Sequence, residues 1–144
     1  MWWLLVTMLL VIVIWYNKPQ PILVEVKQRY DKLRTHLATL NDPRWNKLIK
    51  PSIITGMVDW DKSKGAIGYN VNKGYEIGIC LKGEDANSAF YVLLHELAHI
   101  TVSEYDHSTE FWKNFKELKE IATSQGLYDK QTGAVTYCGE VITY

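Results

Sequence analysis

Three of the four histidines in this 144-residue chain lie close together, beside one glutamate. His95 and His99 are four residues apart in "VLLHELAHI". Four residues of α-helix turn by about 400°, so both imidazoles leave the same face and can bind one ion. Glu96 follows the first histidine and projects beside the pair, where its carboxylate can accept a proton from water. This H-E-x-x-H spacing is typical of two metal ligands and a general base.

A catalytic zinc ion needs three protein ligands and an open fourth position for water. We predict that His107, eight residues after His99, is the third ligand. The carboxylates of Glu104, Asp106 and Glu110 are alternatives, because Asp and Glu also bind zinc. A set of imidazoles suits Ca²⁺ or Mg²⁺ poorly, so Zn²⁺ is the expected cofactor. A lone histidine is more often a hydrogen-bonded core or surface residue, and the prediction therefore depends on the whole set.

The elements that must position this set are mainly helices. The histidine pair falls in a predicted helix over residues 86–103, and apolar residues at helical spacing predict a second helix over 109–124. An earlier helix is expected over residues 22–40, on the same criterion. The expected helix signals are Asp85 or Asn87 as the first N-cap, Ser108 as the second, and Gly126 as a terminator.

Short runs of β-branched and aromatic residues predict the strands. They cover residues 52–58, 66–71 and 75–81, and "NKG" forms the turn between the last two. The tail, residues 134–144, is expected to be one further strand. We therefore predict an α+β domain in which a small sheet with an edge hairpin packs on the metal-binding helix and the helix after it.

The stretch "NVNKGYEIGICLKGEDANSAFYVLLHELAHITVSEYDHSTEFW" resembles the WLM family of zinc metallopeptidases, relatives of the SprT/Spartan proteases. The resemblance covers about residues 67–122. It is carried by the "N-x-G-x-E-I" hairpin, by "LLHELAH", and by a downstream histidine followed by "EFW". It implies a zincin-like fold in which His95, His99 and His107 bind zinc and Glu96 activates water.

The resemblance also implies a place for a polypeptide substrate. In such families the strand before the metal helix usually forms the edge of the cleft and pairs with the substrate backbone. Here that strand would be residues 75–81, which makes Tyr75, Ile77 and Ile79 the expected substrate-binding residues. Tyr105 and Tyr137 are candidates for an additional donor to the oxyanion.

The N-terminal stretch from Trp2 to Tyr16 contains no charged residue and carries aromatic residues at both ends. As a helix it would rise about 22 Å, short of a hydrocarbon core of about 30 Å but tolerable where a bilayer thins. We predict a membrane anchor over residues 1–17, a linker over 18–21 and the peptidase domain over 22–144. A cleaved signal peptide and a helix buried in a core or by a partner are the alternatives. Basic residues after the span predict a cytoplasmic domain: Lys18, Lys27, Arg29, Lys32 and Arg34.

Charge and cysteine content restrict the partners. Residues 18–50 carry a net charge of +5, residues 51–144 carry −5, and no aromatic-interleaved basic patch indicates nucleic acid. Cys80 and Cys138 are expected to be packing residues in a chain without a disulfide framework. The expected function is a membrane-tethered zinc-dependent peptidase. The alternatives are a catalytically silent scaffold in a larger assembly, such as a membrane-associated virion component, and a domain that uses metal only to stabilise its fold.

Overall fold

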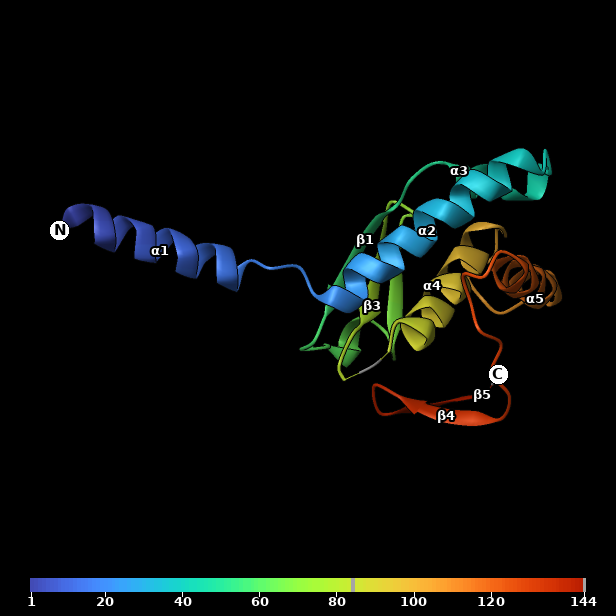
Figure 1. The fold of residues 1–144 in the computed structure, drawn as a ribbon. Helices are drawn as coiled ribbons and strands as arrows, with labels where there is room; N and C mark the ends of the chain where they lie inside the picture. Colours follow the sequence, from blue (N-terminus) through green and yellow to red (C-terminus); the bar gives the residue numbers. More distant parts are fainter. Residues whose placement is uncertain (84, 144) are drawn as a thin grey trace.

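The computed structural model describes residues 1–83 and 85–143, and it shows a mixed α+β chain with two small sheets (Figure 1). The larger sheet has the order β1 (Ile53–Met57), β3 (Glu76–Cys80), β2 (Gly68–Val71). Strand β3 pairs with β1 in parallel and with β2 antiparallel. The smaller sheet is a hairpin of β4 (Ala134–Tyr137) and β5 (Glu140–Thr143). The α+β class predicted from the sequence is confirmed.

Helix α4 (Ala86–Ile100) is the central element of the domain. It packs against β2 and β3, against α5 (Thr109–Ser124) and against α2 (Pro21–Thr39) (Figure 1). Almost all of its residues are buried, which fixes its rotation about its own axis. The short elements are α3 (Asn46–Ile49) and two 3₁₀ turns, η1 (Pro43–Trp45) and η2 (Lys62–Lys64).

The helix signals in the sequence act as expected. The Asp85 carboxylate caps α4 by accepting a hydrogen bond from the Ser88 N–H at 2.7 Å. The Ser108 hydroxyl caps α5 by accepting one from the Phe111 N–H at 3.2 Å. Helix α5 has the predicted bounds, whereas α4 ends three residues before the predicted Ser103.

The predicted position of the substrate-binding strand is wrong. Strand β3 lies between two other strands and is not an edge, and the side chains of Ile77 and Ile79 are fully buried in the core. The physical reason is that β1, from a distant part of the sequence, pairs with the side of β3 that was expected to be free. The exposed edge beside α4 belongs to β2.

The tail forms two strands, not one. Cys138 and Gly139 both have positive φ, 49° and 81°, and they make the tight turn that reverses the chain between β4 and β5. Such a turn needs left-handed backbone at both central residues. The last residue of the predicted strand, Tyr144, lies outside the described residues.

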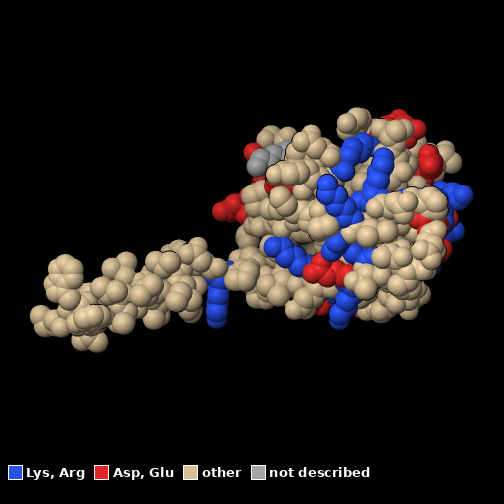
Figure 2. All heavy atoms as spheres, turned by 90° about the horizontal axis from the view of Figure 1, so that it is seen from above, with Lys and Arg blue, Asp and Glu red and all other residues tan. Residues whose placement is uncertain are grey.

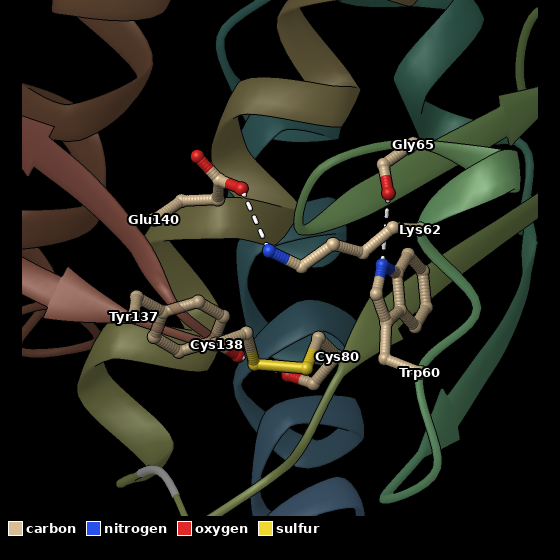
Figure 3. Close-up of a disulfide and its surroundings, with 7 residues drawn as sticks. All are labelled: Trp60, Lys62, Gly65, Cys80, Tyr137, Cys138 and Glu140. Carbon is tan, nitrogen blue, oxygen red and sulfur yellow. Dashed lines mark hydrogen bonds and ion pairs between the residues drawn. A yellow bond between two sulfur atoms is a disulfide. The ribbon is translucent and has the colours of Figure 1, made fainter.

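A disulfide joins Cys80, at the end of β3, to Cys138 in the hairpin turn (Figure 3). The prediction that the two cysteines are merely packing residues is therefore wrong. The Tyr137 hydroxyl donates a hydrogen bond to the Cys80 carbonyl, and Lys62 forms an ion pair with Glu140 at 2.9 Å. Together these contacts attach the hairpin to the end of the larger sheet.

Helix α1 (Trp2–Tyr16) extends away from the domain, and every one of its residues is exposed (Figure 1). The alternative that this helix is buried in the core of the domain is therefore wrong. Within the described part of the chain, no single helix has the length and apolarity needed to cross a membrane. Helices α1 and α2 meet those criteria only together, as a pair bent by 58°.

Candidate metal centre

The three clustered histidines converge on one point. His95 and His99 project from the same face of α4, and His107 lies in the chain reversal between α4 and α5. The Nε2 atom of His107 lies 3.2 Å from Nε2 of His95 and 3.1 Å from Nε2 of His99. Among the described residues, this group of three is the set that could hold a metal ion, and Glu104, Asp106 and Glu110 do not join it.

The spacing of these nitrogens fits zinc. Zn²⁺ binds imidazole nitrogen at about 2.0–2.1 Å with tetrahedral geometry, which separates two ligand nitrogens by about 3.3 Å. The observed separations of 3.1 and 3.2 Å are close to this value. A neutral imidazole has one N–H and one lone pair, so hydrogen bonds cannot satisfy three Nε2 atoms that all face one another. A cation at their centre can.

The electrostatic surroundings keep the two helix histidines neutral. The pKa of His95 is lowered to about 3, mainly by burial and in addition by the charges of His99, His107 and Lys119. Burial also lowers the pKa of His99 to about 4, with His107 and Lys73 contributing. Neutral imidazole is the form that binds metal, so both side chains are ready ligands near pH 7.

One aromatic ring, that of Phe111, contacts all three imidazoles. Phe111 is fully buried, and its ring centroid lies 5.1, 4.4 and 4.7 Å from those of His95, His99 and His107. The ring of Trp112 also contacts His107, at 5.3 Å between centroids. Because α5 begins just before Phe111, its N-terminus fixes the imidazoles against an apolar base. Phe111 is one of the apolar residues at helical spacing that predict α5, but nothing in the sequence connects it with the histidines.

Glu96 lies beside the histidines in a water-poor position. It is 7% exposed, and burial raises its pKa to about 7, which suits a group that must both accept and release a proton near neutral pH. A cavity of about 240 Å³ opens beside it, lined by Gly68, Asn70, Lys73, Glu96, His99 and Tyr105. A methyl group at Gly68 would lie 3.0 Å from Glu96 Oε1, so glycine keeps this approach open.

Two polar residues near the β2–β3 turn hold the site in place, and no sequence motif predicted their role. The Asn70 side chain donates to the Glu96 carbonyl at 2.9 Å and accepts from the Gly74 N–H at 2.7 Å. The Lys73 ammonium donates to three carbonyls at the end of α4 and in the loop after it, those of His99, Val102 and Glu104. The only signal available in the sequence was that Lys73 lies in the predicted "NKG" turn and Asn70 near the end of the predicted strand before it.

The other predicted site residues are dispersed. Tyr137 is buried, and its hydroxyl donates to the Cys80 carbonyl at the far end of β3, which is the wrong place for an oxyanion donor. Tyr105 is 85% exposed and lines the cavity beside Glu96. Tyr75 is exposed at the start of β3, outside that cavity.

Comparison with known proteins agrees with this geometry. The WLM domain model matches residues 53–139, which contain the three histidines and Glu96. An uncharacterized protein of Acanthamoeba polyphaga mimivirus is 39% identical over 83 residues, covering 51% of this chain and 42% of its own length. An uncharacterized protein of Invertebrate iridescent virus 6 is 35% identical over 91 residues, covering 57% and 51%.

The chain thus spans about half the length of these curated relatives, or less. No solved structure matches it. The family match covers more than half of the chain, including the metal helix, the edge strand beside it and the downstream histidine. The chain belongs to the WLM domain family, whose members are metallopeptidase-like.

Proposed function

We propose that the chain is a zinc-dependent peptidase that hydrolyses polypeptides within a zincin-like fold. The observation that carries this proposal is the convergence of three imidazole Nε2 atoms beside a buried carboxylate that opens into a cavity. Structural zinc sites are usually closed by four protein ligands. Here three ligands meet next to an accessible space, which is the arrangement of a catalytic site.

In this mechanism His95, His99 and His107 would hold the ion, and Zn²⁺ would supply a Lewis acid for the scissile carbonyl and lower the pKa of a water. Glu96 accepts a proton from the attacking water as the new C–O bond forms at the carbonyl carbon. It then delivers that proton to the amide nitrogen as the C–N bond breaks. The pKa of about 7 that burial gives Glu96 fits both transfers.

Strand β2 is the element that can hold the substrate. The Cys80 N–H bonds to the Ile67 carbonyl, so main-chain groups of alternate residues from Ile67 onward face β3. Those of Gly68 and Asn70 consequently face outward, along the edge beside Glu96. A polypeptide that adds to this edge would pass the three histidines with its carbonyl groups close to the carboxylate.

The test uses the full chain in detergent micelles, incubated with an unfolded protein substrate in the presence of zinc. Cleavage should appear with zinc, disappear with a chelator and fall by at least about a hundredfold in Glu96→Gln. Glu120→Gln, an exposed carboxylate on α5, is the matched control and should retain full activity. If zinc binds with full stoichiometry and no substrate is cut by the wild type, the site belongs to a silent scaffold and the peptidase proposal is wrong.

We also propose that α1 anchors the protein to a membrane. Its fifteen residues are uncharged, apolar except for Thr7, and all exposed, which gives a surface that water does not favour and that a bilayer would cover. Flotation with liposomes tests this: the wild type should float, and Leu9→Lys with Val13→Lys should stay in the dense fraction. If the intact mass of protein made by cells corresponds to a chain that begins after α1, this segment is instead a cleaved signal peptide.

Two features make opposite predictions about the side on which the domain lies. The basic residues after α1 favour the cytoplasmic side, while the Cys80–Cys138 disulfide is typical of an oxidising environment. Protease protection of the domain in sealed vesicles separates the two. We propose the cytoplasmic side. Protection of the domain in right-side-out vesicles that is lost when detergent is added would support it, and digestion in intact vesicles would contradict it.

A further inference from the structure

A second cavity lies beyond the end of the candidate cleft. It has a volume of about 680 Å³ and sits where β1 and β3 begin and β2 ends. Its walls come from α3, the segment after it and the β2–β3 turn. The lining residues are Asn46, Lys47, Lys50, Pro51, Ile53, Asn72, Lys73, Gly74 and Tyr75.

The charged residues that line this cavity are all positive. Three of its lining residues are lysines and none is acidic. Lys73 is already engaged with carbonyls, but Lys47 and Lys50 are exposed. Within the described residues, neither of these two lies within ion-pair distance of a carboxylate. Two unpaired ammonium groups therefore face a concave space that lacks a counter-charge.

The cavity also has apolar walls. Ile53 is 51% exposed and Tyr75 is 63% exposed, and both line it. A ligand with a short apolar stem and a carboxylate would satisfy the apolar walls and the two lysines together. Glutamate and aspartate side chains have this composition.

The cavity and the candidate active site share one lining residue, Lys73, at the turn where β2 ends. Strand β2 runs from Gly68, beside Glu96, to the turn at Asn72. Because a strand rises about 3.3 Å per residue, a polypeptide paired with the β2 edge would travel about 13 Å from Glu96 to this turn. Its side chains would enter the second cavity about five residues from the bond that is cut.

We propose that this cavity is a substrate subsite that binds an acidic side chain about five residues N-terminal to the scissile bond, through Lys47 and Lys50. The N-terminal direction follows from antiparallel pairing with β2, which is the more stable arrangement for an added strand. The inference depends on the proposed peptidase function. It also gives the exposed Tyr75 a place in substrate binding, as a wall of this subsite and not as part of an edge strand.

Anionic lipid is the other ligand that such lysines could meet. Figure 2 shows Lys and Arg side chains gathered on the face of the domain seen from above, the face over α2 and α3. A bilayer surface, however, is broad and would not fill a concave space with apolar walls next to a cleft. The position of the cavity at the end of β2, with Lys73 shared between the two spaces, therefore favours a polypeptide.

The test compares two peptides that differ only at the fifth residue before the cleaved bond, Glu in one and Gln in the other. The full chain in micelles with zinc should cleave the Glu peptide with a kcat/KM about fivefold higher. Lys47→Gln with Lys50→Gln should bring the ratio to one, and the double change to Glu should reverse the preference toward a Lys peptide. Lys113→Gln with Lys116→Gln, two exposed lysines of α5, is the matched control and should keep the ratio.

A measurement of peptide binding without cleavage distinguishes failure of the subsite proposal from failure of the proposed peptidase function. Fluorescence anisotropy with the Glu96→Gln protein measures the affinity for the same two peptides without any cleavage. If no peptide is ever cut but the Glu peptide binds more tightly through Lys47 and Lys50, the subsite stands and the peptidase proposal fails. Equal cleavage and equal binding of the two peptides would overturn the subsite.

Binding to lipid vesicles tests whether Lys47 and Lys50 contact anionic lipid and not a peptide. Retention of the full chain on phosphatidylcholine vesicles is compared with retention on vesicles that also contain phosphatidylserine. If Lys47→Gln with Lys50→Gln weakens retention only when phosphatidylserine is present, and leaves the peptide ratio unchanged, the lysines contact lipid and the subsite proposal is wrong. Unchanged retention with a lost peptide ratio supports the subsite.

Discussion

Removing the covalent link between Cys80 and Cys138 should detach the C-terminal hairpin and destabilise the domain (Figure 3). The link closes a loop with a sequence separation of 58 residues. The chain-entropy relation for such a loop gives about 4 kcal/mol of stabilisation, through the unfolded state. Among the contacts that would remain, the side chains of Tyr137 and Ile142 are buried in the core, whereas the other contacts of the hairpin are weak. The exposed Lys62–Glu140 ion pair contributes at most about 1 kcal/mol, and an isolated two-stranded hairpin is marginal in water.

Hydrogen exchange measured by mass spectrometry can follow this change segment by segment. The oxidised protein is compared with the reduced protein and with Cys80→Ala/Cys138→Ala. Amides of β4 and β5 should exchange after reduction as in an unfolded peptide. Amides of α4 that open only by global unfolding should lose about a thousandfold of their protection, which corresponds to about 4 kcal/mol.

The result that would refute this reasoning is a hairpin that stays protected after reduction. Its attachment would then depend on the Tyr137 hydrogen bond and the packing of that ring, and not on the disulfide. Lys62→Gln serves as the control, since it removes only the ion pair and should change hairpin exchange by less than about tenfold. Iodoacetamide labelling of the oxidised protein should find neither cysteine free.

Three further predictions concern the site. His107→Ala should weaken zinc binding more than about a hundredfold in competition with a chromogenic chelator, whereas His36→Ala, a surface change, should leave it unaltered. Phe111→Ala should lower the free energy of unfolding by about 3–5 kcal/mol in a urea titration, and the half-exposed Trp112→Ala should cost much less. Burial raises the pKa of Glu96 from 4.5 to about 7, so the metal-free wild type loses stability as pH rises through that window, because ionisation then favours the unfolded state. Metal-free Glu96→Gln should therefore be more stable than wild type by up to about 3 kcal/mol at pH 8 and equal to it at pH 4, and equal stability at pH 8 would contradict the buried position of the carboxylate.

The helices and the histidine set could be predicted because their signals are local. Helical spacing places His95 and His99 on one face whatever the rest of the chain does, and the Ser108 cap determines where α5 begins. The third histidine follows from the short distance between the two helices. For the same reason, Glu96 could be recognised as a base from sequence, although the burial that sets its pKa could not.

The strand order and the disulfide could not be predicted in the same way, because both depend on residues far apart in sequence. Cys80 and Cys138 are in different elements, and spacing alone does not determine pairing. For β3 a signal did exist: its residues form a nearly continuous apolar run, which is typical of a strand covered on both faces. The position of Lys73 under the end of α4 required the whole tertiary structure.

That position of Lys73 has a consequence for how the ion is captured. Its ammonium group joins the last turn of α4 to the loop that leads to His107, through the carbonyls of His99, Val102 and Glu104. Closing a free loop of eight residues would oppose metal binding by about 2 kcal/mol. Here the hydrogen bonds of Lys73 already join part of that loop to the end of α4, so we expect less of this cost to oppose zinc binding. We therefore expect the hydrogen bonds of Lys73 to favour zinc binding, because they keep the loop that carries His107 next to the helix that carries His95 and His99.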